Sequence, residues 1–279
     1  MTSSIQALKE LTWPAVEWGT RDKPVAIVDG RLYPNAALGS RVEGLAAYVV
    51  GINEKSFPRL CERLRVETLH LYEMRVGDLG PLLQLPDLRG LAIRWNTKLS
   101  DVAPLGRLGP LRTLVLEDTP KVRDLSPLSA LTGLSSLGFS GGIWNKNTAI
   151  SLEPIAALPA LRELALLNLK VESGGLRPIA RCKSLERLEL SNQFPTADYA
   201  YLSVHLPTTQ CEMFNAAVSL QKPIDGKDVM VVGSRKPFLS SRRDKEVLAR
   251  YTRDFSRLQE EFASSPDTRD DRSADDASV

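Results

Sequence analysis

Two consecutive stretches of the chain repeat each other with a period of 23 residues, and this feature restricts the fold more than any other. Residues 88–110 read LRGLAIRWNTKLSDVAPLGRLGP, and residues 111–133 read LRTLVLEDTPKVRDLSPLSALTG. Each stretch can bury about seven aliphatic side chains at roughly 2 kcal/mol each, which does not offset an ordering cost of about 1–2 kcal/mol per residue. A single repeat therefore cannot fold alone, so we expect the repeats to stack into a solenoid.

Each repeat divides into a predicted strand and a predicted helical turn. The opening L-x-x-L-x-L alternates apolar and polar residues as a strand does, so successive strands should lie side by side in a parallel sheet. The aliphatic residues of the second half are three apart, as at Leu125, Leu128 and Leu131, which favours a short helical or 3₁₀ turn. Asp101, three residues before Pro104, can cap the free N–H groups where such a turn begins.

The same opening extends the array in both directions. We predict that the residues at its three apolar positions point inward in every repeat and form one continuous core. A degenerate last unit follows 23 residues after Leu185. The triplets outside the two clear repeats are Leu45, Tyr48 and Val50; Val66, Leu69 and Leu71; Leu134, Leu137 and Phe139; Leu161, Leu164 and Leu166; Leu185, Leu188 and Leu190; and, in the degenerate unit, Thr208, Cys211 and Met213.

These patterns identify a likeness to a known repeat family. The L-x-x-L-x-L opening followed by D-x-x-P-L, as at Asp101 and Asp124, resembles the leucine-rich repeat of the short bacterial class seen in internalin-like proteins. The resemblance covers about residues 45–214. It implies an α/β leucine-rich-repeat solenoid with a curved parallel sheet and short helical or 3₁₀ turns on the convex side, capped at both ends. The asparagine that usually follows the strand is in register only at Asn96, so we expect some irregular loops.

The repeat that begins at Leu134 is four residues longer than its neighbours and contains the segment SGGIWNKNTAI. Gly141 and Gly142 permit unusual backbone angles. Trp144 has no position in the repeat pattern. Two interpretations remain open: the tryptophan folds back over the convex side, or it projects as a contact residue at the rim of the sheet.

Residues 1–44 do not carry the repeat, and we interpret them as an N-terminal cap. A short helical pattern around residues 5–11 leads to Trp13 and Trp18, followed by VAIVDGRLY. Asp29 and Gly30 between short apolar runs are typical of a hairpin turn. The alternative is that the segment is a partner-binding arm.

Residues 215–263 are expected to form a C-terminal cap. GKDVMVVG predicts a strand after a turn at Asp225 and Gly226, and RRDKEVLARYTRDFSRLQEEF predicts an amphipathic helix that packs on the last repeat. Residues 264–279 are polar with almost no aliphatic side chains, which is typical of a disordered tail.

Composition excludes several classes of protein. The chain is 43% hydrophobic and 25% charged with a formal charge of +2, as soluble globular proteins are, which sets no strong expectation of a polyanionic partner. The three widely spaced residues Cys61, Cys182 and Cys211 favour neither a disulfide framework nor a zinc site, and we expect Cys182 and Cys211 to be buried. No apolar segment has the length of a membrane span or signal peptide. We therefore expect a cytoplasmic protein, unless a signal-independent route exports it.

The sequence contains no recognisable catalytic arrangement. Only two histidines are present, His70 and His205, and neither belongs to a triad-like pattern. A phosphate-binding loop, a dinucleotide-binding glycine motif and an H-E-x-x-H zinc motif are all missing. We predict no catalytic residue, no cofactor and no metal, so the protein is expected to be non-enzymatic.

The outward strand residues form the candidate site, because a curved sheet presents them as one concave binding surface. Tyr72, Arg94 and Trp95 cluster on adjacent repeats, and these residue types carry much of the energy of protein interfaces. A structural role is the alternative, in which Trp95 shields the sheet edge or stacks on Arg94. The predicted contact residues are His70, Tyr72, Glu73, Arg94, Trp95, Glu117, Asp118, Trp144, Asn168 and Asn192.

The predicted function is that of a protein-binding scaffold or adaptor whose partner is another protein. One alternative is binding of a polyanion, either nucleic acid or an anionic membrane surface, through the basic segment 235–245. A second alternative is a secreted effector or toxin-neutralising protein that acts by binding protein. The cationic residues of the basic segment are Arg235, Lys236, Arg242, Arg243 and Lys245.

Overall fold

The computed structural model describes residues 25–34, 36 and 38–264. The chain divides into two compact units. The first, here called the repeat unit, comprises the chain up to Ser191 together with Thr208–Cys211, and the second, the C-terminal unit, comprises Asn192–Pro207 and the chain from Glu212 onward. The predicted helix around residues 5–11, Trp13, Trp18 and the predicted tail lie outside the described residues.

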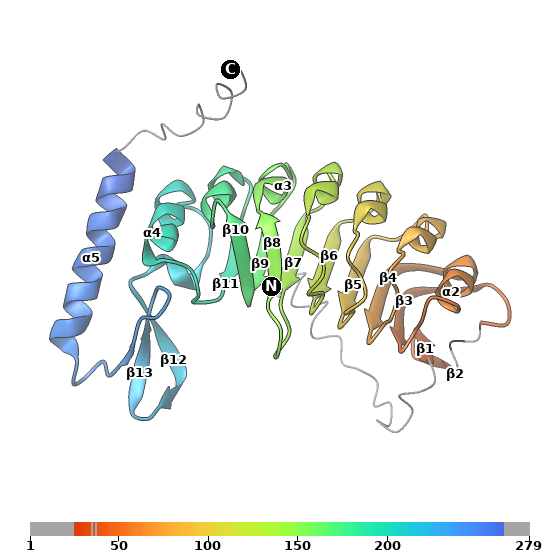
Figure 1. The fold of residues 1–279 in the computed structure, drawn as a ribbon, viewed down its shortest axis with the longest axis horizontal. Helices are drawn as coiled ribbons and strands as arrows, with labels where there is room; N and C mark the ends of the chain where they lie inside the picture. The colour runs from red at the N-terminus through yellow and green to blue at the C-terminus, as the bar shows by residue number, and fades with distance from the viewer. Residues whose placement is uncertain (1–24, 35, 37, 265–279) are drawn as a thin grey trace, which may run out of the picture. The chain divides into compact units, whose positions relative to one another are not determined.

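The repeat unit is built on a nine-stranded sheet in the order β11-β9-β7-β6-β5-β4-β3-β1-β2 (Figure 1). All pairs from β3 to β11 are parallel, as the repeat predicts, and each repeat adds one strand. The strands are β1 Val25–Val28, β2 Arg31–Pro34, β3 Val42–Val50, β4 Leu64–Tyr72, β5 Gly90–Arg94, β6 Thr113–Glu117, β7 Ser136–Ser140, β9 Glu163–Leu167 and β11 Arg187–Leu190.

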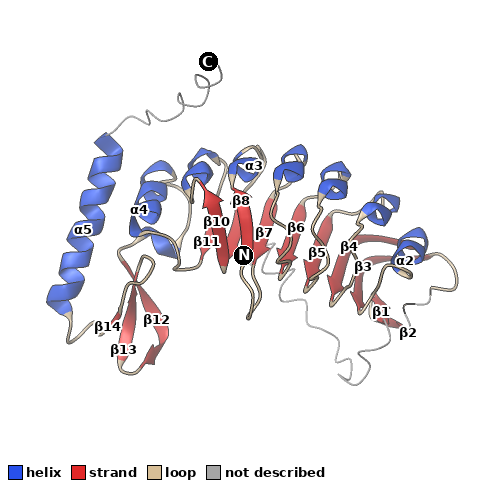
Figure 2. Cartoon of the chain, viewed as in Figure 1, coloured by secondary structure: helices blue, strands red, loops and turns tan. Residues whose placement is uncertain are grey.

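Short helices form the opposite wall of the repeat unit (Figure 2). Each of these helices has a proline at one of its first two positions. A backbone N–H there would have no intrahelical acceptor, so the proline costs no hydrogen bond. The carboxylate of Asp101 accepts the N–H of Ala103 at 2.8 Å, and the carboxylate of Asp124 accepts the N–H of Ser126, also at 2.8 Å. The helices are α2 Phe57–Arg63, α3 Glu153–Ala156 and the 3₁₀ turns η2 Gly80–Gln84, η3 Ala103–Arg107, η4 Ser126–Ala130 and η5 Arg177–Arg181.

The core lies between the sheet and these helices. Leu91, Leu114 and Leu137 stand opposite one another on adjacent strands and are fully buried, as are Leu105 and Leu128 on the helical wall. Aliphatic side chains from successive coils therefore form the single stacked core that the 23-residue period predicts.

The register predicted for the first repeat is wrong by one residue. Leu45, assigned to an inward position, is 70% exposed, whereas Ala47 and Val49 are fully buried and pair with Leu69 and Leu71. The reversal follows from the strand period, because a one-residue slip moves every side chain to the other face. Gly44 takes the first inward position because a Cβ there would collide with the side chain of Asp29.

The predicted N-terminal hairpin is confirmed. Strands β1 and β2 pair antiparallel around Asp29 and Gly30, which both have positive φ. The carboxylate of Asp29 accepts the backbone N–H groups of Leu45 and Ala46, each at 2.9 Å. Since β1 also pairs antiparallel with β3, the hairpin extends the sheet beyond its first parallel strand.

The degenerate last coil is reduced to a single bridge between Arg187 and Gln210. The hydroxyl of Thr209 is buried and donates to the carbonyl of Leu185 at 2.6 Å. Cys211 is partly exposed, so its predicted burial is wrong, because the chain leaves the sheet after the bridge and no strand carries it inward.

The described part of the C-terminal unit contains the helices α4 and α5, a short 3₁₀ turn and a small antiparallel sheet. The predicted turn at Asp225 and Gly226 is confirmed, with positive φ at both residues between β12 and β13. In the long helix α5, Phe255 is buried and Phe262 meets Tyr201 of α4 edge to face, with ring centroids 5.3 Å apart. The elements are α4 Thr196–His205, η6 Glu212–Phe214, β12 Ala217–Ile224, β13 Lys227–Val231, β14 Phe238–Leu239 and α5 Lys245–Ser264.

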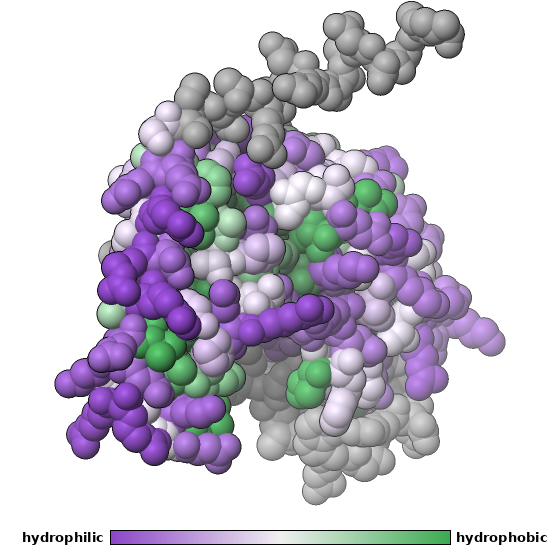
Figure 3. Space-filling view, turned by 60° about the vertical axis from the view of Figure 1, so that its left-hand side comes forward, coloured by the Kyte–Doolittle hydropathy of each residue, from purple (hydrophilic) through white to green (hydrophobic). Residues whose placement is uncertain are grey.

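Amphipathicity explains why α5 packs within this unit. Its apolar residues recur on one helical face, as predicted, and the surface seen in Figure 3 is mostly hydrophilic with small apolar patches. The helix begins at Lys245, later than predicted, because Asp244 precedes it and its carboxylate binds the N–H of Ser240 at 2.7 Å. That this unit and the N-terminal residues cap the array stays a prediction.

Candidate protein-binding site

The outward residues of the parallel strands form two rows on the concave face of the repeat unit. We call them the central row and the rim row, because the second lies at the carboxyl ends of the strands. The central row is Tyr48, His70, Ala92, Val115, Gly138, Ala165 and Glu189, and the rim row is Tyr72, Arg94, Glu117, Ser140 and Leu167.

The rim row brings together three predicted contact residues. The rings of Tyr72 and Trp95 meet at 63° with centroids 5.9 Å apart. Arg94 forms an ion pair with Glu117, with Nε and Oε2 3.4 Å apart, so the guanidinium is held by the carboxylate of the next strand. Trp95 is 37% exposed and Tyr72 is partly exposed. This cluster of two aromatic rings and a held guanidinium has the composition of an interface anchor.

A left-handed backbone turn follows several strands at the same place in the coil. Glu73, Trp95, Asp118 and Asn168 have φ between +46° and +54°. This region costs a non-glycine residue roughly 1–2 kcal/mol, which the packed coils around it must offset. The turn redirects the chain from the sheet toward the helical wall. Sequence reasoning missed it, because glycine, the usual marker, occupies none of these four positions.

His70 belongs to the central row and has little surface left for a partner. It is 4% exposed, and its ring stacks on Tyr48 with centroids 4.6 Å apart. Burial, together with the charge of Arg94, lowers the pKa of His70 to about 4. Nε2 of the ring is buried without a hydrogen-bond partner. His70 is therefore a neutral, packed side chain near pH 7.

Trp144 projects from the loop of the long repeat and is 90% exposed, as is Ile143, so the interpretation that the tryptophan folds back is wrong. The amide of Asn168 fixes the loop by donating to the carbonyls of Gly142, at 2.7 Å, and Asn145, at 3.2 Å. Asn168 thus supports the loop that carries Trp144.

The two glycines of this loop serve close approach rather than unusual angles, which corrects the prediction. Neither Gly141 nor Gly142 has a positive φ. A Cβ on Gly141 would collide with the backbone carbonyls of Asn168 and Asn145, and one on Gly142 would collide with the carboxylate of Asp118. The loop can pack here only because both side chains are missing.

We expect Gly141→Ala to lower the free energy of unfolding by about 1–3 kcal/mol, because the obstructing atoms are backbone and cannot move aside. Gly109→Ala is the matched control, since nothing lies within 4 Å of a Cβ there. Urea denaturation of both variants checks this expectation. Equal stability of the two variants would contradict the crowding at Gly141.

Of the remaining predicted contacts, Glu73 and Asp118 lie at the left-handed turn, where both are partly exposed. Asn192 belongs to the C-terminal unit. Its side-chain amide donates to the carbonyl of Val231 at 2.8 Å, and its oxygen accepts the N–H of Gly233 at 2.6 Å. Asn192 therefore holds a loop of its own unit.

The asparagine that follows the strand in this repeat class is present at Asn96 and is replaced one repeat later. Asn96 is fully buried, donates to the carbonyl of Val76 at 2.8 Å and accepts the N–H of Leu99 at 3.3 Å. One repeat later Thr119 stands in its place. Asn147, the first residue of strand β8 (Asn147–Ser151), accepts the N–H of Thr119 at 3.1 Å and donates to its hydroxyl at 3.2 Å. Asn147, from the long repeat, thus supplies an asparagine side chain where Thr119 has replaced the usual one.

The coils that contain β4, β5 and β6 share one plan. The L-x-x-L-x-L strand faces the D-x-x-P-L turn across a shared core, and the strands stand in parallel register. The repeat unit has the fold of a leucine-rich-repeat solenoid. The insertion in the repeat that begins at Leu134 adds a second parallel pair, β8 Asn147–Ser151 with β10 Leu169–Ser173.

Two internalins are among the solved structures that are similar to this chain. Internalin C2 from Listeria monocytogenes is 24% identical with a TM-score of 0.46, covering 59% of this chain and 69% of its own. An internalin, inlF, from the same organism is 18% identical with a TM-score of 0.33, covering 57% of this chain and 63% of its own. No protein-family model and no curated protein matches the chain.

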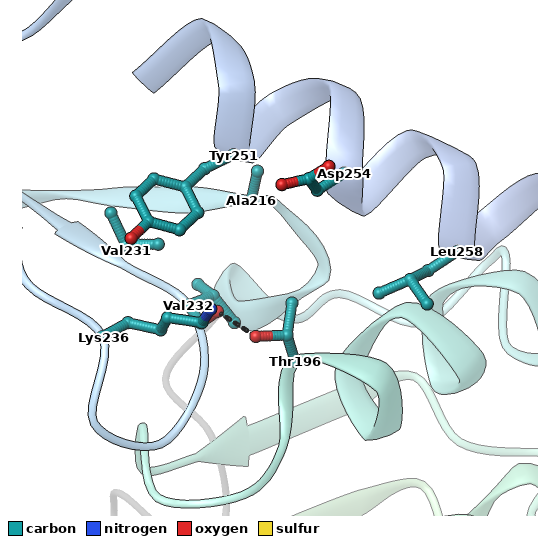
Figure 4. Close-up of a pocket in the computed structure, with 8 residues that line it drawn as sticks. All are labelled: Thr196, Ala216, Val231, Val232, Lys236, Tyr251, Asp254 and Leu258. Atoms are coloured by element: carbon teal, nitrogen blue, oxygen red, sulfur yellow. Dashed lines mark hydrogen bonds between the residues drawn. The ribbon is translucent and has the colours of Figure 1, made fainter. Parts of the chain in front are cut away.

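The C-terminal unit contains a shallow pocket between α5 and the small sheet (Figure 4). The hydroxyl of Thr196 donates to the carbonyl of Val232 at 2.9 Å, and Lys236 lies over the ring of Tyr251, with Nζ 5.1 Å from its centroid. Thr196 and Lys236 therefore already interact with neighbouring groups. Its lining residues are Thr196, Ala216, Val231, Val232, Lys236, Tyr251, Asp254 and Leu258.

The basic segment 235–245 is exposed at all of its cationic residues. Arg235 has a positive φ of 61° in the turn before β14, and Arg243 donates to the carbonyl of Gly226 at 3.3 Å. Binding of a polyanion by this segment stays a prediction.

The described residues provide no cluster of potential metal ligands, and two of the three thiols are buried. Residues 25–34, 36 and 38–264 contain no group of three or more potential metal ligands. Burial raises the pKa of Cys61 to about 12 and that of Cys182 to about 11, so both thiols stay protonated near pH 7. In the same part of the chain, no helix is sufficiently long and apolar to span a bilayer.

Proposed function

We propose that this leucine-rich-repeat protein is a non-enzymatic scaffold that binds another protein through the rim of its concave face. The cluster of Tyr72, Arg94 and Trp95 on adjacent coils carries the proposal. Tyrosine, tryptophan and arginine bury large areas with little loss of side-chain freedom, and they dominate the energy of many protein interfaces.

Preorganisation supports the same role. The rim residues stand at the ends of hydrogen-bonded parallel strands and at the left-handed turns that follow them. Glu117 holds Arg94, and Tyr72 contacts Trp95. A partner would therefore meet side chains that are already oriented, which reduces the entropy lost on binding.

The mixed charge of the rim defines the kind of partner. Arg94 lies beside Glu117, and Glu73 and Asp118 flank the aromatic pair. A surface with both signs of charge around aromatic side chains suits a folded protein or peptide better than a uniformly charged polymer.

The test is an affinity purification with the full chain as bait, followed by calorimetry with the purified partner. We expect Tyr72→Ala, Arg94→Ala and Trp95→Ala combined to weaken binding at least 30-fold, because interface anchors each contribute about 2 kcal/mol or more. Circular dichroism and thermal melts establish that the variant stays folded.

The matched control changes the opposite wall. Gln84 and Arg107 occupy equivalent exposed positions in η2 and η3, one repeat apart. Gln84→Ala with Arg107→Ala should leave the affinity within about twofold. If a folded rim variant binds as tightly as the unchanged protein, the rim is not the binding site.

A further inference from the structure

A loop in the repeat that begins at Leu134 exposes two large apolar side chains that are adjacent in the sequence. Ile143 and Trp144 are both 90% exposed, whereas Leu45, the next most exposed of the large apolar residues that the structure describes, is 70% exposed. In Figure 1 the loop between β7 and β8 extends beyond the carboxyl ends of the neighbouring strands. Contiguous exposed apolar side chains commonly mark an interaction surface. The rim cluster of the proposed function does not include this pair.

Hydrogen bonds on both sides of the apolar pair hold the loop in place. The side-chain amide of Asn168 donates to the carbonyls of the two residues that flank the pair, Gly142 at 2.7 Å and Asn145 at 3.2 Å. The N–H of Gly141 donates to the carbonyl of Leu167 at 2.9 Å. The pair therefore stands on a fixed base and does not pack back against the repeat.

Exposed lysines accompany the apolar pair. Hydrogen bonds of Asn147 and Asn168 connect the loop, residues 141–147, to the segments 118–121 and 168–170 of the coils on either side. The loop and these two segments together contain three lysines, all exposed, and one acidic residue, which is partly exposed. The apolar pair thus stands among cationic side chains. The lysines are Lys121, Lys146 and Lys170, and the acidic residue is Asp118.

We infer that residues 141–147 form an anchor that attaches this protein to the surface of an anionic phospholipid bilayer. The side chains of Ile143 and Trp144 enter the boundary between headgroups and acyl chains, where an amphipathic indole ring is favoured. The three lysines bind the anionic headgroups around that point. The protein lies on the membrane in this way without spanning it. This is an activity beyond the proposed function, and it does not depend on the rim cluster.

The surroundings of Trp144 favour a fluid bilayer over a shaped protein pocket. The rings of Tyr72 and Trp95 contact each other, and Trp95 is 37% exposed, so a protein partner meets oriented rings at the rim. Trp144 is 90% exposed, so neighbouring side chains do not orient its ring. A bilayer accepts a side chain in many orientations, whereas a pocket requires one and the binding loses the corresponding entropy. Ile143 has no aromatic face to stack on bases, which favours lipid over single-stranded nucleic acid.

The charges near the loop favour an anionic surface over a neutral one. Two carboxylates of the neighbouring coils are held by arginines. Glu117 pairs with Arg94, with Oε2 and Nε 3.4 Å apart, and Glu172 pairs with Arg123, with Oε1 and Nη2 2.6 Å apart. The lysines therefore keep an excess of positive charge beside the apolar pair. Each lysine close to an anionic surface strengthens binding by about fivefold.

Sedimentation of the full chain with extruded vesicles tests the inference without any protein partner. We expect the protein to sediment with vesicles made of equal parts of phosphatidylcholine and phosphatidylglycerol. Binding to vesicles of phosphatidylcholine alone should be at least tenfold weaker, because the lysines then have no anionic headgroups to bind. Added salt should reduce binding to the anionic vesicles, because it screens the lysines.

Two variants separate the apolar contribution from the electrostatic one. Ile143→Ala combined with Trp144→Ala should weaken binding to the anionic vesicles at least tenfold, because the apolar area is lost. Replacing the three lysines together should weaken it at least 50-fold. All five residues are exposed, so neither variant removes a core contact. The lysine substitutions are Lys121→Gln, Lys146→Gln and Lys170→Gln.

The matched controls make the same chemical changes away from the loop. Leu32→Ala combined with Leu45→Ala truncates two apolar side chains that are 55% and 70% exposed. A second control removes three exposed cations in or next to the helices of the opposite wall. Both controls should leave binding to the anionic vesicles within about twofold. The cation substitutions are Arg59→Gln, Arg107→Gln and Lys183→Gln.

A fluorescent label reports whether the loop enters the bilayer. Ile143→Cys in a Cys211→Ser background carries an environment-sensitive dye and keeps Trp144, while Cys61 and Cys182 are buried. The emission of the dye should shift to shorter wavelength when the anionic vesicles are added, and lipid brominated in its acyl chains should quench it. The same dye at Leu45→Cys should show neither change.

Three outcomes overturn the inference: the protein does not bind the anionic vesicles, it binds neutral and anionic vesicles equally, or the folded variant without Ile143 and Trp144 binds as tightly as the unchanged protein. Lysine-dependent binding of single-stranded DNA, with no shift of the label on vesicles, would also overturn it and assign the lysines to nucleic acid. None of these experiments uses the rim variants, so the proposed function can survive a failure here, and membrane binding can be observed even if no partner binds the rim.

Discussion

Leu114→Ala is expected to lower the free energy of unfolding by about 2–5 kcal/mol. Leu114 is fully buried in β6, between Leu91 of β5 and Leu137 of β7. Stacked coils on both sides limit how far the structure can collapse into the cavity, so both the lost burial and the residual cavity contribute. Urea denaturation monitored by circular dichroism measures the change.

Leu45→Ala provides a control with identical chemistry. Leu45 is 70% exposed, so its truncation should change the free energy of unfolding by less than about 0.5 kcal/mol. The pair also tests the corrected register of β3. A large loss for Leu45→Ala with a small one for Leu114→Ala would mean that the leucine ladder is assigned to the wrong face.

Acidification should destabilise the protein through His70 by about 3 kcal/mol. The pKa of His70 is about 4 in the fold against an ordinary value of 6.5, because burial, helped by Arg94, disfavours the charged ring. Between these values the unfolded chain binds the proton and the folded chain does not. Stability is therefore fully present above pH 6.5 and declines as the pH falls toward 4.

His70→Phe isolates this effect, because phenylalanine keeps a ring against Tyr48 and cannot titrate. The measurement is the free energy of unfolding at several pH values between 7 and 4, in both proteins. The difference between the two proteins removes the contribution of carboxylates such as Glu54 and Asp124, whose pKa values are lowered by hydrogen bonds. Parallel pH dependences would show that His70 titrates normally.

Much of the array could be predicted from the sequence because its signals are local and repeated. The spacing of Leu91 and Ile93 specifies a strand, and that of Leu105 and Leu108 specifies the turn, wherever the coil stands in the stack. Register failed in β3, where AAYVV contains no alternation of apolar and polar residues. The packing of Asp29 against Gly44 decided it, and this contact joins residues distant in sequence.

The candidate site was only partly predictable. Tyr72, Arg94 and Trp95 could be placed on adjacent strands by counting, because the repeat fixes which residues are neighbours. The solvent exposure of these side chains could not be predicted by counting along the repeat. His70 and Trp95 are both outward in the pattern, yet one is 4% exposed and the other 37%.

The sequence by itself determined that this chain stacks 23-residue coils around an aliphatic core, because each repeat carries its own strand and turn chemistry and cannot bury its apolar face alone. Only the tertiary structure decided which outward residues meet water, which loop carries Trp144 away from the surface, and where the polar atoms of the concave face lack partners. The physical reason is that burial and hydrogen-bond satisfaction depend on groups brought together from separate coils, whereas strand and turn formation depend on neighbours along the chain.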